Sequence, residues 1–267
     1  MDRIAFIMGE TFVYWSAIIL TLAAATAACA FVALYLGRTG KAISAALAVP
    51  MALVFSLILA RFMHWYCRAD SYESFFVAMT DHSSGGYALI GVFAGCILAA
   101  LILRLFRRVE SLGQLLDCAC IAGAAGIAVG RLSCFFNADD RGMLLTELTR
   151  LPLAYSSVSP ISGAEEFRLA TFLLQAFGAG ILFLALLHFY VKQDRAPHPC
   201  GHGDVFGIFM IIYCAMQAVL DSTRYDSLFL RSNGFVSMVQ ILGAVIMAVS
   251  IVLFSIRMVK ANGFKWW

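Results

Sequence analysis

Residues 130–142 place ionisable and amide side chains at the end of a long apolar stretch. This segment reads GRLSCFFNADDRG and includes Arg131, Asn137 and Asp139. An arginine at a helix centre costs about 2.5 to 3.5 kcal/mol on membrane-insertion scales, so an arginine in such a position is a candidate for function. The alternative is that Arg131 extends its guanidinium to the headgroup region and only anchors its helix.

Two further arginines lie near the ends of other apolar stretches. They are Arg61 and Arg224, and Arg224 follows Asp221 by three residues, a spacing that lets the two side chains meet on one helix face. The alternative is an ordinary interfacial ion pair, which contributes little at an exposed site. A planar guanidinium binds a phosphate through two parallel hydrogen bonds. Three arginines at one membrane level therefore indicate binding of a phospholipid headgroup.

The composition indicates which elements position these residues. Hydrophobic residues make up 62% of the 267-residue chain and charged residues 13%, and apolar runs long enough to cross a bilayer recur along it. We therefore predict an all-α polytopic membrane protein with one integral membrane domain over residues 1–267. The first apolar segment is too long for a signal-peptide core, so we expect it to remain as a helix. The seven predicted spans are 12–36, 42–66, 85–106, 112–136, 168–191, 204–224 and 234–257.

The distribution of positive charge predicts the orientation of these spans. The chain's four lysines and several of its arginines fall in loops on one side, including Lys41, Arg108, Lys192 and Lys260. Positive loops favour the cytoplasm, so the N-terminus is predicted outside and the C-terminus inside. The second, fourth and sixth spans then run outward. This orientation brings Arg61, Arg131 and Arg224 to the outer face together.

Several of these motifs resemble those of one known family. Residues 130–142 are similar, at the same spacing, to the prolipoprotein diacylglyceryl transferase signature G-R-[IL]-G-N-F-[IV]-N-G-E-x-[WY]-G. Residues 60–66 resemble the G-A-R-x-x-Y segment at the end of the family's second helix, and residues 203–224 resemble its sixth helix. The glycine-rich residues 85–91 stand where the family begins its third helix, and Gln240 fits its last helix.

The resemblance implies transfer of the diacylglyceryl group of phosphatidylglycerol to a cysteine thiol in the signal peptide of a prolipoprotein, with release of glycerol phosphate. It implies a multi-pass protein of the bacterial cytoplasmic (inner) membrane. We expect no cofactor, no metal and no nucleic acid partner, and the sequence leaves the oligomeric state open. The thiol, with an ordinary pKa of about 8.5, must lose its proton, and the phosphate that leaves must have its charge stabilised.

On this resemblance we assign roles to ten residues. The predicted catalytic residues are Arg131, Arg224, Asn137, Asp139, Asp221 and His82. The predicted substrate-binding residues are Arg61, Gly142, Cys134 and Tyr87. The arginines would bind the phosphate, the asparagine would orient the headgroup, and the two carboxylates would hold the arginines or accept a proton. The glycine would let the outer loop approach the lipid closely.

The sequence also departs from the family's motifs. Cys134 replaces the motif's first asparagine, Asp139 its glutamate and Arg141 its aromatic residue. The H-G-G that introduces the family's third helix is replaced by Gly-Tyr-Ala at residues 86–88, and the nearest histidine along the chain is His82, a shifted candidate for the base. Alternatives therefore include a divergent or inactive relative that binds phospholipid with another acceptor.

Other features are interpreted as structural. Most of the eight cysteines lie in apolar runs, where cysteine behaves as a small hydrophobic residue, whereas Cys134 is either such a residue or a nucleophile. His198, Cys200 and His202 are interpreted as a solvated loop, because no further ligand accompanies them. A small-molecule transporter is the rival class of function. It is disfavoured because strongly polar residues, Gln175 and Gln217 apart, keep to the ends of the spans.

Overall fold

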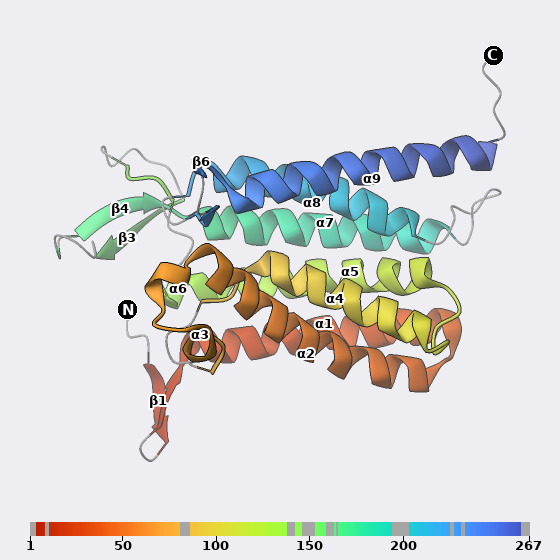
Figure 1. Cartoon of the computed structure of the whole chain (residues 1–267), viewed down its shortest axis with the longest axis horizontal. Helices are drawn as coiled ribbons and strands as arrows, with labels where there is room; N and C mark the ends of the chain where they lie inside the picture. Colours follow the sequence, from red (N-terminus) through yellow and green to blue (C-terminus); the bar gives the residue numbers. More distant parts are fainter. Residues whose placement is uncertain are drawn as a thin grey trace.

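The computed structural model is a bundle of long helices lying side by side, with short strands gathered at one end (Figure 1). It describes residues 4–8, 11–80, 86–137, 142–145, 153–158, 163, 165–193, 203–224, 227–230 and 233–262. The long helices are α1 (Trp15–Thr39), α2 (Ala42–Cys67), α4 (Leu89–Leu105), α5 (Leu112–Gly130), α7 (Thr171–Gln193), α8 (Asp204–Asp221) and α9 (Met238–Asn262). The prediction of an all-α polytopic membrane protein is confirmed.

Within the described residues, six of these helices are long and apolar enough to cross a membrane by length and composition. The exception is α4, the predicted span 85–106, which has 17 residues and begins only at Leu89. At 1.5 Å per residue it rises about 26 Å, less than the roughly 30 Å of a hydrocarbon core. Its start is delayed because Ala88 is extended and donates its N–H to Ala60 O of α2, 3.0 Å away. The predicted count of seven full-length spans is therefore corrected to six and one shorter apolar helix.

Short elements connect the helices at the end that carries the strands. The helical turns are η1 (Ala69–Ser71), α3 (Phe75–Thr80), η2 (Arg131–Ser133) and α6 (Cys134–Asn137). Three antiparallel hairpins pair β1 (Ile4–Met8) with β2 (Thr11–Tyr14), β3 (Ala154–Val158) with β4 (Glu165–Leu169), and β5 (Phe229–Leu230) with β6 (Asn233–Ser237). Two helices therefore begin later than the predicted spans. Residues 168–169 belong to β4, so α7 begins at Thr171, and residues 234–237 belong to β6, so α9 begins at Met238.

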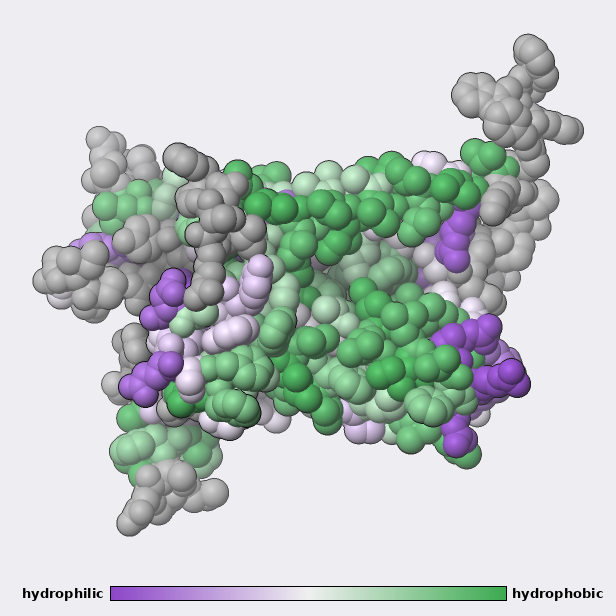
Figure 2. All heavy atoms as spheres, in the orientation of Figure 1, coloured by the Kyte–Doolittle hydropathy of each residue, from purple (hydrophilic) through white to green (hydrophobic). Residues whose placement is uncertain are grey.

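The surface agrees with a membrane-spanning bundle. On the face drawn in Figure 2, hydrophobic residues cover the middle, and hydrophilic residues gather at the two ends. The hairpins lie at one end of the bundle, while the last turns of α9 lie at the other (Figure 1). The two ends of the described chain are thus on opposite sides of the apolar belt.

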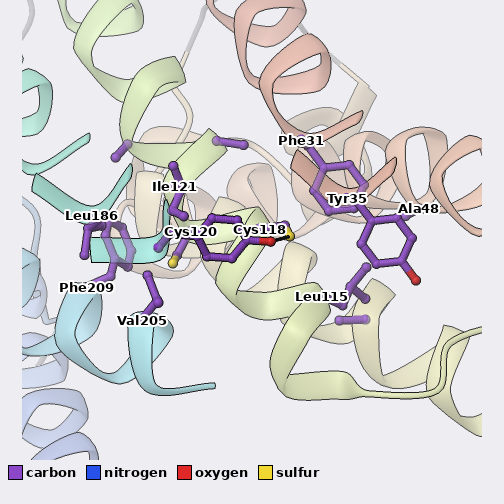
Figure 3. Close-up of a cluster of buried hydrophobic side chains, with 14 of the residues drawn as sticks. Phe31, Tyr35, Ala48, Leu115, Cys118, Cys120, Ile121, Leu186, Val205 and Phe209 are labelled. Carbon is purple, nitrogen blue, oxygen red and sulfur yellow. Dashed lines mark hydrogen bonds between the residues drawn. The ribbon is translucent and has the colours of Figure 1, made fainter. Parts of the chain in front are cut away.

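The core is built from small and aromatic side chains. Figure 3 shows Phe31 and Tyr35 of α1, Cys118 and Ile121 of α5, and Phe209 of α8 in one buried cluster. The described cysteines form no disulfide, and the buried ones pack as small hydrophobic residues, as expected.

Helices α2 and α4 pack backbone to backbone. A Cβ built on Gly91 would overlap the backbone of Leu59 and Ala60, and one built on Gly95 would overlap that of Ser56. Small residues permit this approach, which supplies dense van der Waals contact between membrane helices. The close packing fixes the end of α2 that carries Arg61 against the start of α4.

The opposite end of the bundle is joined by a buried carboxylate. Asp117 of α5 is 1% exposed and accepts the backbone N–H groups of Gly203, 2.7 Å from Oδ2, and Phe206, 2.8 Å from Oδ1. These N–H groups have no partner within their own helix at the start of α8, and the helix dipole favours an anion there. One side chain of α5 thus caps a neighbouring helix.

We predict that Asp117→Ala destabilises the bundle. Two partly buried N–H groups would lose their acceptor, which should lower the free energy of unfolding by about 1 to 3 kcal/mol. Thermal unfolding in detergent, followed by circular dichroism, measures the change. Gln114→Ala, on the first turn of the same helix, is the control and should shift the midpoint much less. Equal shifts in the two variants would contradict the capping role.

The orientation of the bundle gives a second prediction. Reporter fusions at Lys41, Arg108 and Lys260 should report the cytoplasm, and a fusion near Glu147 should report the outside, because the lysine-bearing loops stay inside. Accessibility of introduced cysteines to an impermeant reagent provides an independent measurement. An outward position for Lys260 would contradict the predicted orientation.

Candidate functional site

The motif arginine lies where α5 ends. After Gly130 the chain tightens into the turn η2, whose Ser133 Oγ donates to Gly130 O at 2.7 Å, and then into the single turn α6. Arg131 is therefore at the end of a span and is partly exposed. Beside it, Leu132 and Phe135 expose 41% and 38% of their surface, which gives an apolar surface at the level of the arginine.

The far end of the same motif is clamped by two other segments. Gly142 forms an antiparallel bridge with Arg224, just after α8, and donates its N–H to Leu169 O of β4 at 3.2 Å. Arg168 Nη1 donates to Gly142 O at 3.3 Å. The structure therefore brings Gly142 and Arg224 together, although they are far apart in sequence.

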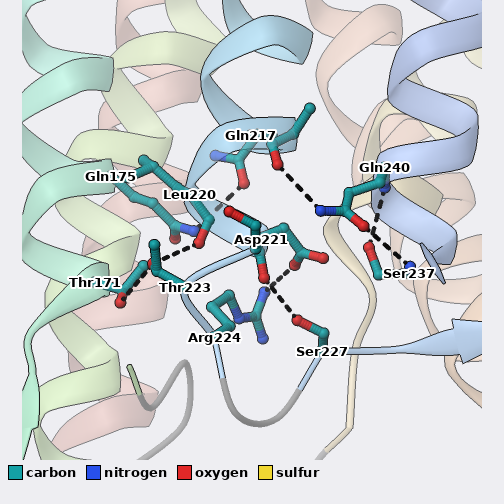
Figure 4. Close-up of polar contacts among 12 residues, drawn as sticks. Thr171, Gln175, Gln217, Leu220, Asp221, Thr223, Arg224, Ser227, Ser237 and Gln240 are labelled. Atoms are coloured by element: carbon teal, nitrogen blue, oxygen red, sulfur yellow. Dashed lines mark hydrogen bonds and ion pairs between the residues drawn. The ribbon is translucent and has the colours of Figure 1, made fainter. Parts of the chain in front are cut away.

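The ion pair expected from the spacing of Asp221 and Arg224 is present. Arg224 Nη1 lies 3.4 Å from Asp221 Oδ1, with side chains that are 13% and 0% exposed (Figure 4). Ser227 Oγ donates to Asp221 O at 3.0 Å, which closes the turn after α8. Asp221 Oδ2 is buried and makes no hydrogen bond within the described residues. The pair is thus largely withdrawn from solvent and is not the exposed pair considered as the alternative.

Buried amides continue the polar cluster from Asp221 into the bundle. Gln175 Nε2 of α7 donates to Gln217 Oε1 of α8 at 3.4 Å, and Gln217 Nε2 donates to Tyr213 OH at 3.0 Å. Gln240 Nε2 of α9 donates to Ala218 O at 3.3 Å. Helices α7, α8 and α9 are therefore joined by polar contacts near the arginine (Figure 4).

Sequence reasoning missed one buried arginine. Arg168 is 6% exposed and binds Glu166 Oε2 through Nη2 at 2.7 Å and Nε at 3.2 Å, while its Nη1 reaches Gly142. It is the first residue of the predicted span 168–191, and an arginine at the start of a span is common. The available signal for a paired arginine on a strand is the alternation of polar and apolar residues from Glu166 to Leu169, with Glu166 two residues before Arg168.

Arg61 lies in a separate pocket of contacts. It is 1% exposed, and it donates from Nε to Ala78 O at 2.5 Å and from Nη1 to Gly86 O at 2.9 Å. Its guanidinium lies 5.2 Å from the ring centre of Tyr72 and 5.6 Å from that of Tyr87. Arg61 and Tyr87 thus join α2, α3 and the segment before α4.

Cys134 packs in an apolar cluster. It is 9% exposed and lies with Ala170 and Phe172, beside Tyr155 and Leu173. These surroundings favour the small hydrophobic residue over the nucleophile, because a reactive thiolate needs a partly exposed, electropositive setting. Three other assigned residues cannot be compared with the structure in full. Asn137 is the last residue of α6, but its side chain is not among the described atoms, and Asp139 and His82 lie outside the described residues.

A family model described as prolipoprotein diacylglyceryl transferase matches residues 3–256 of the chain. The chain belongs to this family. Relatives named phosphatidylglycerol–prolipoprotein diacylglyceryl transferase include proteins of Lactococcus lactis subsp. lactis, 26% identical over 98% of this chain and 97% of the relative, and Finegoldia magna, 26% identical over 93% and 95%. One from Clostridium botulinum is 24% identical over 92% and 96%. The resemblance seen in the motifs is confirmed.

The structure gives its own reason for the last glycine of the family's signature. A Cβ built on Gly142 would overlap Leu169 O and would lie 2.7 Å from Thr171 Oγ1 and 2.8 Å from Leu169 Cβ. From the sequence, Gly142 is expected to let the loop come close to a lipid. In the structure, Gly142 lies close to Leu169 of β4 and to Thr171 at the start of α7. In this member of the family the glycine seals the contact between the signature loop and its neighbours.

We predict that Gly142→Ala disrupts this contact. The added methyl group must displace the backbone of Leu169, and such overpacking typically costs about 1 to 3 kcal/mol. The midpoint of thermal unfolding in detergent should fall. Gly123→Ala is the matched control, because a Cβ at Gly123 of α5 would meet nothing within 4 Å. A Gly142→Ala variant as stable as the control would show that the loop gives way easily.

Proposed function

We propose that the chain transfers the diacylglyceryl group of phosphatidylglycerol to the cysteine thiol of a prolipoprotein signal peptide. The observation that carries this proposal is the bridge between Gly142 and Arg224, in a chain of this family. It joins the signature segment that begins with Gly130 and Arg131 to the backbone of Arg224, whose guanidinium is held by Asp221. Arg131 at the start of this segment and Arg224 beside its last glycine thereby lie at one end of the apolar belt, where the phosphate of a lipid headgroup lies.

The chemistry requires stabilisation of a phosphate as it leaves. The thiolate sulfur attacks a glyceryl carbon, the bond from that carbon to the phosphate oxygen breaks, and glycerol phosphate departs with added negative charge. Preorganised charged donors lower the barrier to such a step, because they are already oriented when the charge develops. The contact with Asp221 fixes the orientation of Arg224, and the end of α5 fixes the position of Arg131.

The surroundings of Arg131 suit a lipid substrate. Leu132 and Phe135 are exposed next to it, and Trp15 of α1 stacks on Phe136 with ring centres 5.9 Å apart. Acyl chains in contact with this surface would leave the headgroup at the level of the arginine. Tryptophan is typical of the membrane interface. We place the reaction at the outer face of a bacterial cytoplasmic membrane.

A direct assay tests the proposed function. Purified protein is incubated with phosphatidylglycerol in detergent and a synthetic peptide that contains a lipoprotein signal cysteine, and the peptide mass is measured. We expect an increase equal to one diacylglyceryl group and release of glycerol phosphate. The same peptide with serine in place of cysteine is the control and should stay unmodified. Headgroup release without peptide modification would indicate a different acceptor.

We predict that Arg131→Lys reduces transfer although the charge is retained. Lysine is a point charge and cannot make the two parallel hydrogen bonds of a guanidinium. Loss of one charge-assisted bond in the transition state, about 1.4 kcal/mol or more, lowers kcat/KM by about tenfold or more. Arg107→Lys, at an exposed site at the opposite end of the bundle, is the control. Normal turnover by Arg131→Lys, at normal amounts of protein in the membrane, would show that Arg131 only anchors its helix at the headgroup region.

A further inference from the structure

The proposed transfer needs a group that accepts the proton of the incoming thiol, and the inference below rests on that proposed function. The structure describes two histidines, His64 and His188. His64 lies at the end of the bundle that carries Arg131 and Arg224, whereas His188 lies near the opposite end, on the last turns of α7. Imidazole is the side chain best suited to move protons near neutral pH. His64 is half-buried on the last turn of α2.

The imidazole of His64 fills the space that a side chain at position 86 would occupy. A Cβ built on Gly86 would lie 2.5 Å from Cε1 of His64 and 2.8 Å from each of its ring nitrogens. Gly86 has a φ of +83°, which side chains rarely adopt. Arg61, one turn before His64, donates to the carbonyl of the same glycine at 2.9 Å. Two side chains of α2 thus hold one backbone segment.

This contact joins two positions at which the chain departs from the family's motifs. The G-A-R-x-x-Y segment has tyrosine where this chain has His64, and the H-G-G segment has histidine where this chain has Gly86. The two positions touch in the structure. In this chain the imidazole of His64 therefore occupies the space into which a side chain at position 86 would project. We propose that His64 accepts the thiol proton in this chain, the role that sequence reasoning gave to His82.

A neighbouring hydroxyl orients the ring for this task. Tyr72 OH lies 3.1 Å from Nδ1 of His64, and the two rings meet edge to face with centres 6.1 Å apart. When Nδ1–H donates to Tyr72 OH, Nε2 carries the lone pair. Nε2 takes the thiol proton, the sulfur forms its bond to the glyceryl carbon, and the phosphate keeps the electron pair of the broken carbon–oxygen bond. The imidazolium then returns the proton to the departing glycerol phosphate.

A chain of side-chain contacts also leads from the end of α2, through α9, to α8. Cys67, on the same face of α2 as His64 and three residues later, donates from Sγ to Met238 Sδ at 2.8 Å. Met238 begins α9, and Gln240 of α9 donates to the carbonyl of Ala218, three residues before Asp221 on the last turn of α8. One chain of contacts therefore connects the His64 turn to the turn that positions Arg224.

The first test compares His64→Gln with the wild type in the peptide assay. Glutamine keeps a hydrogen bond to Tyr72 but cannot accept the proton, so kcat should fall by about 100-fold, a typical contribution of a general base. The KM for phosphatidylglycerol should change little. His188→Gln is the matched control and should keep wild-type activity. If His64→Gln stays within about threefold of the wild type, or if His82→Ala alone abolishes transfer, the proposal is overturned.

A second test separates proton transfer from a structural role. The paired substitution His64→Tyr with Gly86→His restores the arrangement of the family's motifs and should regain activity that His64→Tyr alone loses. If the paired variant does not fold, added imidazole should restore turnover to His64→Ala. A folded but inactive pair, or His64→Ala without rescue, overturns the proposal. No transfer by the wild-type protein would instead refute the proposed function itself.

Discussion

The backbone of Gly142 holds together three stretches of the chain that are distant in sequence. It bridges Arg224 after α8, accepts Arg168 of β4 and donates to Leu169. Each contact uses a main-chain group, so the register of the signature loop is set by the loop itself and not by its variable side chains. This helps to explain how the site can carry Cys134 and Arg141 in place of the family's residues and still bring Arg224 to the loop.

The two ends of the bundle meet the demand for buried hydrogen bonds in different ways. At the end predicted to face the cytoplasm, Asp117 satisfies the first turn of α8, and Arg257 lies 3.5 Å from Asp204 on that same turn. At the other end, Asp221 retains a buried oxygen without a partner in the described residues. Leaving such a group unsatisfied costs stability. The first arrangement only stabilises the fold, whereas the second places an unsatisfied acceptor beside the proposed headgroup site.

Much of the fold follows from local patterns in the sequence, and much of the site does not. Apolar length predicts the spans, and the spacing of Asp221 and Arg224 predicts their ion pair, because both depend on neighbours along the chain. The bridge from Gly142 to Arg224 depends on residues about eighty positions apart. Arg168 shows the same limit, since a strand of five residues inside a presumed loop looks like the start of the next helix. The backbone carbonyls of Ala78 and Gly86, which accept hydrogen bonds from Arg61, have no signature in the sequence.

The backbone packing of α2 against α4 has a consequence for how substrates reach the site. With Gly91 and Gly95 in contact with the neighbouring main chain, these two helices can separate only by losing their whole interface at once. They therefore act as a fixed wall that carries Arg61, His64 and Gly86 as one rigid body. A lipid that enters sideways from the bilayer must pass through another seam of the bundle. The groups carried by α2 and α4 then keep their positions while the other helices admit and release the two bulky apolar substrates, the phospholipid and the signal peptide.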